Sequence, residues 1–156
     1  MNAEQTALLA EAWDYFQSLH DPDTYLALLR WPGGVVCPFC ESTESRHTRK
    51  HFRCRSCKRR FTARTGSIFA STPIDLRRWF VVVWLEFNFP LLACPMAIAP
   101  VLGISSQCAA NMLAAVRGTE AFRSAQNAPY AARDENLMCQ RFAWLRQAFL
   151  GEVNPR

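Results

Sequence analysis

Acidic side chains are missing from the middle of this 156-residue chain. No Asp or Glu occurs between Ser45 and Ile74, whereas the same stretch contains nine of the 18 Lys and Arg residues. The net charge of +5 is modest, so positive charge is concentrated in one segment. Residues 1–44 differ, with seven acids against a single base, which excludes them from the same basic surface. The nine basic residues are Arg46, Arg49, Lys50, Arg53, Arg55, Lys58, Arg59, Arg60 and Arg64.

A run of charge is often no more than a solvated surface, and that interpretation is one alternative for this segment. Aromatic residues weaken it, because Phe52 and Phe61 lie among the cations. A metal site that fixed the backbone would weaken it further. We therefore expect the basic segment to bind DNA.

A hydrophobic run of membrane-spanning length is also absent. The longest candidate, residues 79–92, has 14 residues and is interrupted by Glu86, Asn88 and Pro90. Residues 1–19 contain three acids in place of the basic start and apolar run of a signal peptide. We expect a soluble protein without a membrane partner, in a reducing cytoplasm of bacterial type, associated with the nucleoid when it is bound to DNA.

Four of the seven cysteines form two Cys-x2-Cys pairs with thirteen residues between them. The pairs are Cys37 with Cys40 and Cys54 with Cys57. Each pair places two sulfurs on one short loop, so the spacing predicts one tetrahedral zinc ion held by both loops. Disulfides are the first alternative, and the expected reducing compartment disfavours them.

The other metal-binding side chains are less favoured as ligands. His47 and His51 lie between the pairs and are alternative ligands, but four well-spaced thiolates already complete the site. Cys94, Cys108 and Cys139 have no partner at ligand spacing, and we interpret them as small buried hydrophobes. Four cysteine ligands leave no open position for an activated water, so the zinc is expected to be structural.

The hydrophobic pattern predicts two N-terminal helices. The first covers residues 7–19, and the second starts at an Asp21 N-cap with Pro22 in its first turn and ends before Pro32. A small antiparallel ribbon follows, and it is too small for a core of its own, so zinc must contribute on the order of 10 kcal/mol to its folding. The expected extended pieces are residues 35–36, 45–48, 50–53 and 58–62.

A strongly hydrophobic helix is predicted to begin near Asp75. We assign its Trp-rich stripe to core packing rather than to a cofactor site, because no polar group in the stripe would orient a ligand. A last amphipathic helix is expected at about residues 134–150. It either caps the core or forms a dimer contact, and the sequence does not separate these two roles.

Residues 98–117 are similar to a helix-turn-helix. Gly103 supplies the turn after the first helix, and Ser105 or Ser106 caps the second helix. The second helix would then be the one that faces a groove of DNA.

Two polar residues of that second helix, Gln107 and Asn111, point outward and are candidates for contacting base edges. Pro100 falls inside the first helix, and neither helix contains Lys or Arg before Arg117, so phosphate attraction there is weak. A hairpin used only for packing or dimerisation remains the alternative.

The chain resembles zinc-ribbon insertion-sequence transposases over about residues 13–117. The helix-turn-helix similarity rests on the turn 102–105, Leu-Gly-Ile-Ser. The ribbon similarity rests on Arg30-Trp31-Pro32-x-Gly34-x-x-Cys37-Pro38-x-Cys40, Cys54-x-x-Cys57, Phe61-Thr62-x-x-Thr65-Gly66-Ser67-Ile68-Phe69, Ser71 and Leu76-x-x-Trp79.

The departures from this family concern the first cysteine pair and the catalytic region. Glu41 stands where the family usually has glycine, which is expected to tilt the loop. The resemblance implies an RNase H-like catalytic domain after the helix-turn-helix, but only 39 residues follow Arg117. Two-metal strand transfer needs carboxylates on a rigid sheet, so we expect no enzymatic activity from this polypeptide. The acids after Arg117 are Glu120, Asp134, Glu135 and Glu152.

These features predict a mainly α-helical protein with a small β zinc ribbon. The leading hypothesis is a zinc-dependent DNA-binding protein that resembles the DNA-recognition part of a transposase, without catalytic activity of its own and with a homodimer as one candidate assembly. One alternative is a DNA-end-binding subunit whose catalytic chain is encoded separately. Another is a zinc-stabilised protein-interaction adaptor. The expected parts are N-terminal helices (1–34), a four-cysteine zinc ribbon (35–70), a helix-turn-helix-like domain (71–117), and a linker with a C-terminal helix (118–156).

Overall fold

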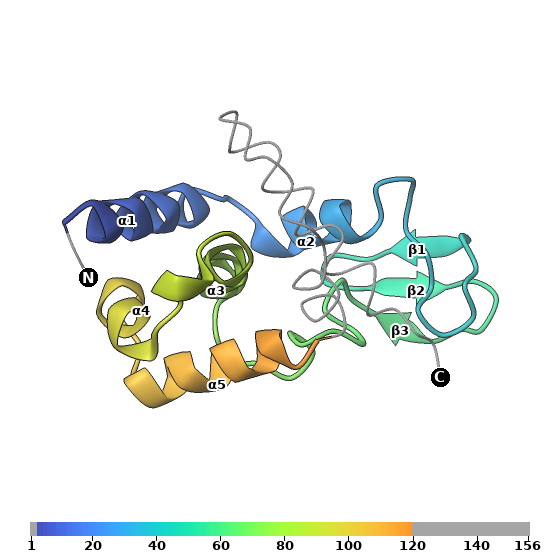
Figure 1. The fold of residues 1–156 in the computed structure, drawn as a ribbon. Coiled ribbons are helices and arrows are strands. Elements are labelled where there is room, and N and C mark those ends of the chain that lie inside the picture. Colours follow the sequence, from blue (N-terminus) through green and yellow to red (C-terminus); the bar gives the residue numbers. More distant parts are fainter. Residues whose placement is uncertain (1–2, 120–156) are drawn as a thin grey trace.

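The structure is a computed structural model that describes residues 3–119. It confirms a mainly helical protein with one small sheet, and it places the helix bundle at one end of the molecule and the sheet at the other (Figure 1). The predicted helix at 134–150 and Cys139 lie outside the described residues. The elements are α1 (Ala3–Gln17), α2 (Pro22–Arg30), β1 (Ser45–His47), β2 (Phe52–Cys54), β3 (Arg60–Phe61), α3 (Leu76–Asn88), the 3-10 helix η1 (Pro90–Leu92), α4 (Pro95–Leu102) and α5 (Ser106–Arg117).

Helix α3 is the centre of the helical core and packs against α1, α2 and α5. Asp75 caps it by accepting a hydrogen bond from the Arg77 backbone N–H at 2.7 Å. The ring of Phe80, fully buried, lies 5.9 Å from the ring of Phe16 in α1 and 5.5 Å from that of Tyr25 in α2. The predicted stripe on this helix is therefore core.

Helices α4 and α5 form the predicted helical hairpin. Gly103 ends α4 in the left-handed conformation (φ 62°), which glycine adopts without a steric penalty. Ser105 caps α5 by accepting a hydrogen bond from the Cys108 backbone N–H at 3.1 Å. The two helices meet at 114°, within the range of helix-turn-helix pairs, and α4 continues through Pro100.

No single helix within residues 3–119 has the length and hydrophobicity needed to cross a membrane. The bent pair α4 and α5 reaches that length and composition only when its two helices are counted together.

The sheet is antiparallel in the order β1-β2-β3. Its register aligns His47 with Phe52 and Phe52 with Phe61. Residues 35–36, which we expected to be extended strand, have no strand partner. They lead into the first cysteine loop, whose hydrogen bonds close within the loop instead.

Two side-chain contacts join the ribbon to helix α2. Arg30, at the end of α2 and only 3% exposed, donates hydrogen bonds to the backbone carbonyls of Ala63 (2.7 Å) and Thr65 (2.6 Å). Arg64 makes a two-pronged ion pair with Asp23 at 2.7 and 2.9 Å. The ribbon is therefore anchored through the segment that follows β3.

Candidate metal centre and basic surface

The two cysteine loops share one backbone hydrogen bond. The Cys37 N–H donates to the carbonyl of Ser42 at 2.9 Å, and the Cys54 N–H donates to the carbonyl of Arg59 at 3.0 Å. In each loop the first cysteine thus bonds to the residue five positions later. The hydroxyls of Ser42 and Ser56 join the loops at 2.9 Å.

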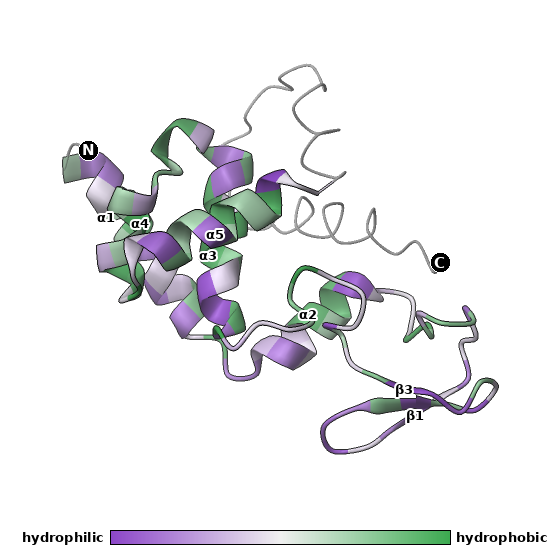
Figure 2. Cartoon of the chain, turned by 90° about the horizontal axis from the view of Figure 1, so that it is seen from below, coloured by the Kyte–Doolittle hydropathy of each residue, from purple (hydrophilic) through white to green (hydrophobic). Residues whose placement is uncertain are grey.

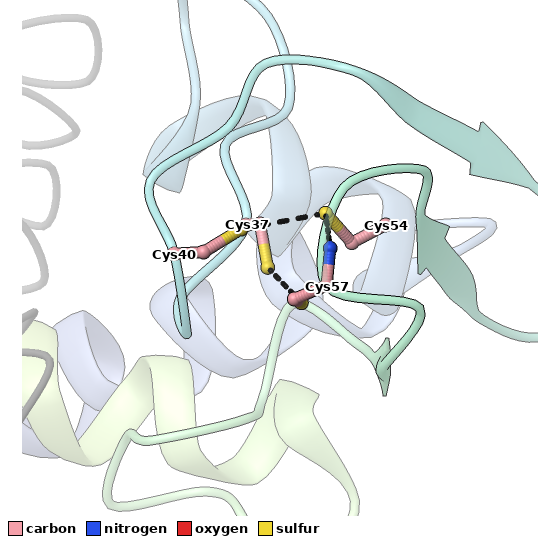
Figure 3. A group of neighbouring side chains, drawn as sticks. All are labelled: Cys37, Cys40, Cys54 and Cys57. Carbon is pink, nitrogen blue, oxygen red and sulfur yellow. Dashed lines mark hydrogen bonds between the residues drawn. The ribbon is translucent and has the colours of Figure 1, made fainter.

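The four sulfurs converge on one point between the loops (Figure 3). All four Sγ atoms lie within 4.8 Å of one another, with Cys37 to Cys57 at 3.6 Å and Cys40 to Cys54 at 3.5 Å. These separations are too long for disulfides and bracket the ~3.8 Å edge of a tetrahedron with Zn–S bonds of about 2.3 Å. The residues fit one structural zinc ion, which these four thiolates hold.

The environments of two of these thiols differ before metal binds. The backbone N–H of Cys57 donates to the Cys54 sulfur at 3.4 Å and lowers the pKa of Cys54 to about 6. Burial raises the pKa of Cys37 to about 11. Because zinc binds thiolates, metal uptake releases protons from this site.

One residue of the first cysteine loop has a backbone conformation that usually requires glycine. Glu41 follows the second cysteine of its loop and has φ 60°. Its N–H donates to the Cys37 carbonyl at 2.9 Å, as a closed turn requires. Glu41 therefore adopts the left-handed conformation itself, at a cost of about 1–2 kcal/mol, and the tilt that we expected from replacing glycine stays a prediction.

Arginines form a row across one face of the sheet. The register aligns Arg46 with Arg53 and Arg53 with Arg60, and all three are exposed. Directly paired residues of adjacent strands point to the same face, so the three arginine side chains lie on one face of the sheet, where the Arg53 guanidinium also donates to the Lys58 carbonyl at 3.3 Å. We call these three residues the arginine row. Figure 2 shows hydrophilic residues along these strands and their loops.

The opposite face of the sheet is aromatic. Phe52 stacks on His47 (4.7 Å between ring centres) and on Phe61 (5.5 Å). Trp31, which follows α2, packs edge-on against both phenylalanines at 5.6 and 5.8 Å. The aromatic residues that interleave the cations in sequence therefore hold the sheet on α2 and leave the arginine row facing outward.

The remaining predicted basic residues occupy three places. Arg49 and Lys50 lie in the turn between β1 and β2, and both are exposed. Exposed cations also surround the second cysteine loop. Arg64 differs from the others because its ion pair with Asp23 raises the pKa of Arg64 and occupies its guanidinium. The cations of the second loop are Arg55, Lys58 and Arg59.

The candidate base-contacting residues lie on the exposed side of α5. Gln107 donates a side-chain hydrogen bond to Asn111 at 3.0 Å, one helical turn away. They are far along the chain from the arginine row. Arg117, the first cation of this hairpin, is paired with the buried Glu86 at 2.7 Å.

The histidine and cysteine alternatives have separate outcomes. Neither His47 nor His51 belongs to the metal-binding cluster, which within the described residues contains cysteines alone. Cys94 is exposed at the start of α4, so its interpretation as a buried hydrophobe was wrong, and Cys108 is half-buried. Cys94 is the N-cap residue of α4, directly after the buried Ala93, so apolar neighbours in the sequence do not bury its side chain.

Sequence reasoning missed the structural role of Arg30. The signal in the sequence was its place in the Arg-Trp-Pro motif, as the single Lys or Arg of residues 1–44. The structure gives that partner as two backbone carbonyls of the ribbon.

Comparison with known proteins finds similarity in the region of the ribbon. Residues 23–60 match the family described as "Transposase zinc-ribbon domain". Over 64 residues the chain is 34% identical to an uncharacterized protein in the transposable element ISH50 of Halobacterium salinarum, and the match covers 38% of this chain. The chain spans only 22% of that relative's length. No solved structure matches. Residues 23–60 are thus similar to a transposase zinc ribbon, and the four cysteines within this segment can hold one zinc ion.

Proposed function

We propose that this protein binds DNA through the arginine row of its zinc ribbon. The observation that carries the proposal is the alignment of Arg46, Arg53 and Arg60 on adjacent strands. Arginine binds phosphate through two parallel hydrogen bonds, and phosphate contacts supply most of the affinity in non-specific binding to DNA.

Repulsion between the positive charges of the arginine row favours binding of an anion. Like charges directly opposite one another destabilise a sheet. Within residues 3–119, the salt bridges involve Arg64, Arg77 and Arg117, and none of them neutralises a member of the row. A phosphate backbone relieves this repulsion, which the free protein tolerates because zinc and Trp31 hold the strands together.

Zinc supports the row through the chain itself. Arg53 directly precedes the ligand Cys54, and Arg60 follows the ligand Cys57 by three residues. The metal therefore fixes the backbone of β2 and the start of β3. Without zinc these strands would no longer be held in place, so the spacing between the arginine side chains would no longer be fixed.

Additional cations of the ribbon extend the contact. If about four of them meet phosphates, the logarithm of the affinity falls against the logarithm of salt with a slope of roughly −3 to −4. The outward face of α5 adds base contacts through Gln107 and Asn111 rather than phosphate contacts.

The same proposal assigns no catalytic role to the described residues. Among residues 3–119 the cluster that could hold a metal consists of the four cysteines. Four thiolate ligands complete the tetrahedral coordination of zinc and leave no open position for a catalytic water. Asp75 and Glu86, carboxylates of α3 and its cap, are committed to Arg77 and Arg117. A nuclease assay with Mg²⁺ or Mn²⁺ should give no cleavage above that of a buffer blank.

The direct experiment is a titration of fluorescent duplex DNA with zinc-loaded and chelator-treated protein at several salt concentrations. The proposal predicts salt-sensitive binding by the zinc form, and loss of most of it after chelation. Equal binding by both forms, or affinity independent of salt, would refute it. Cys54→Ser, tested as a zinc-free control, should behave like the chelated protein.

Exposed apolar residues favour a second function, contact with another protein. Leu91 is 98% exposed in η1, and Met96 is 73% exposed in the first turn of α4. A separately encoded catalytic chain or a second copy of this protein would cover this corner. Light scattering on the wild-type protein and on Leu91→Ser tests self-association through this surface. A pull-down with a candidate catalytic chain tests the other partner.

A further inference from the structure

The first cysteine loop presents an aromatic ring to solvent. Phe39 lies between the ligands Cys37 and Cys40 and is 40% exposed. Of the large hydrophobic side chains left exposed within residues 3–119, it is the aromatic one. It is not among the residues that pack on the hydrophobic core. The loop therefore holds an apolar ring where burial does not explain it.

A cation from the other loop lies over this ring. The guanidinium carbon of Arg59 is 5.0 Å from the centre of the Phe39 ring, which is cation–π distance. The metal orders both loops, so the ring and the guanidinium are held together before any ligand arrives.

The surroundings of the pair are cationic. Arg59 immediately precedes Arg60, the last member of the arginine row. Arg55 and Lys58 are exposed in the same loop. Glu41 is the acidic residue closest to Phe39 along the chain, and the cations of the second loop outnumber it.

From this arrangement we propose that Phe39 and Arg59 form a stacking site for an unpaired base of DNA. The inference rests on the proposed DNA binding and adds the kind of DNA that is preferred. Aromatic rings and guanidinium planes are the two surfaces on which unstacked bases lie in proteins that bind single strands. A paired base inside a duplex cannot reach such a site, whereas a base in an overhang or frayed end can.

The phosphates and the base would bind to adjacent parts of the ribbon. The arginine row takes the backbone, and the neighbouring Phe39–Arg59 pair takes a base from the same strand. Stacking tolerates every base, so the preference is for unpaired structure rather than for sequence.

The test compares three DNAs with zinc-loaded protein at one salt concentration: a blunt duplex, the same duplex with a single-stranded overhang, and the single strand. Wild-type protein should bind the overhang DNA about tenfold or more tightly than the blunt duplex. Phe39→Ala and Phe39→Leu should remove that preference and leave blunt-duplex affinity within about twofold. Phe39→Trp should retain it.

Leu28→Ala is the matched control, because it truncates an exposed apolar side chain in α2, outside the two cysteine loops and outside the corner formed by Leu91 and Met96. It should leave the preference unchanged. Zinc stoichiometry of each variant is measured alongside, and Phe39→Leu keeps apolar volume in the loop in case Phe39→Ala loses metal.

The outcomes separate this inference from the proposed function. Equal affinity of wild-type protein for blunt and overhang DNA would overturn the stacking site while leaving DNA binding intact. Retention of the preference by zinc-loaded Phe39→Leu would also overturn it. Failure to bind any of the three DNAs would refute the proposed function itself.

A spectroscopic readout adds a second check on wild-type protein. A fluorescent base analogue placed in the overhang should change its emission on binding, because its stacking partner changes, and Phe39→Leu should abolish the change. The same analogue placed within the duplex should respond equally to both proteins. An identical response of the overhang base to both proteins would overturn the stacking site.

Discussion

Glu41 and Lys58 occupy equivalent positions, each directly after the second cysteine of its loop, with φ of 60° and 64°. They are the non-glycine residues within the described chain that have positive φ. The left-handed conformation costs a non-glycine residue about 1–2 kcal/mol, so both loops contain local strain. Closure of the two loops around zinc offsets this cost.

Replacing Glu41 by glycine should stabilise the protein. Relief of the left-handed strain outweighs the extra flexibility of glycine in the unfolded chain, so we expect a gain of about 0.5–1 kcal/mol. Lys58→Gly should act in the same direction. Denaturant titration of the zinc form measures the change.

Glu44→Gly is the matched control for Glu41→Gly, because it removes the same side chain from the same loop region where φ is not positive. It should destabilise by a few tenths of a kcal/mol or more. A loss of stability in Glu41→Gly equal to that of the control would contradict the strain assignment.

Removal of zinc should unfold the ribbon and leave most of the helical core. The ribbon lacks a large core of its own, and structural zinc contributes on the order of 10 kcal/mol to such modules. Helices α1, α3, α4 and α5 pack on one another, and none of them contains a zinc-binding cysteine. Amide spectra recorded before and after chelation should lose the signals of residues 37–61 first; uniform loss, or no change, would argue against this division.

Arg30→Met should weaken the joint between α2 and the ribbon. The substitution removes the two hydrogen bonds that the Arg30 guanidinium donates to the carbonyls of Ala63 and Thr65. Both carbonyl oxygens then lose this donor. We expect a loss of about 2–4 kcal/mol in the free energy of unfolding. Arg49→Met, an exposed change in a turn, should cost less than about 0.5 kcal/mol, and similar costs for both variants would be inconsistent with the anchoring role.

Asn111→Ala should alter base preference without altering the salt dependence of DNA binding. The side chain is neutral, exposed and bonded to Gln107, so it adds no phosphate contact. Selection from random duplexes with the two proteins measures the preference. An unchanged selection pattern would mean that α5 serves packing alone.

Local signals predicted much of the fold. Asp21 caps α2 as expected, Ser105 is the one of the two candidate serines that caps α5, and α3 begins next to Asp75 as predicted, because capping depends on a few neighbouring residues. Gly103 ends α4 as predicted, since the turn needs positive φ. The four cysteines converge because their spacing already limits them to two short loops.

Features that depend on residues far apart in the chain could not be predicted from the sequence. Strand register is set by pairing, so alignment of Arg46, Arg53 and Arg60 was not visible in a list of nine cations. The partners of Arg30 and Arg64 lie 33 or more residues away. Cys94 lies between η1 and α4, and its apolar neighbours in the sequence did not indicate its exposure.

The most direct measurement of the central claim is the salt dependence of DNA binding by Arg53→Ala and Arg64→Ala. Both variants remove one positive charge from the same ribbon, but Arg53 lies in the middle of the arginine row, whereas Arg64 is already paired with Asp23. We predict that Arg53→Ala weakens binding several-fold and makes the log–log salt slope shallower by about 0.9, while Arg64→Ala leaves the slope nearly unchanged. Equal effects of the two substitutions, or no change of slope in Arg53→Ala, would contradict the account.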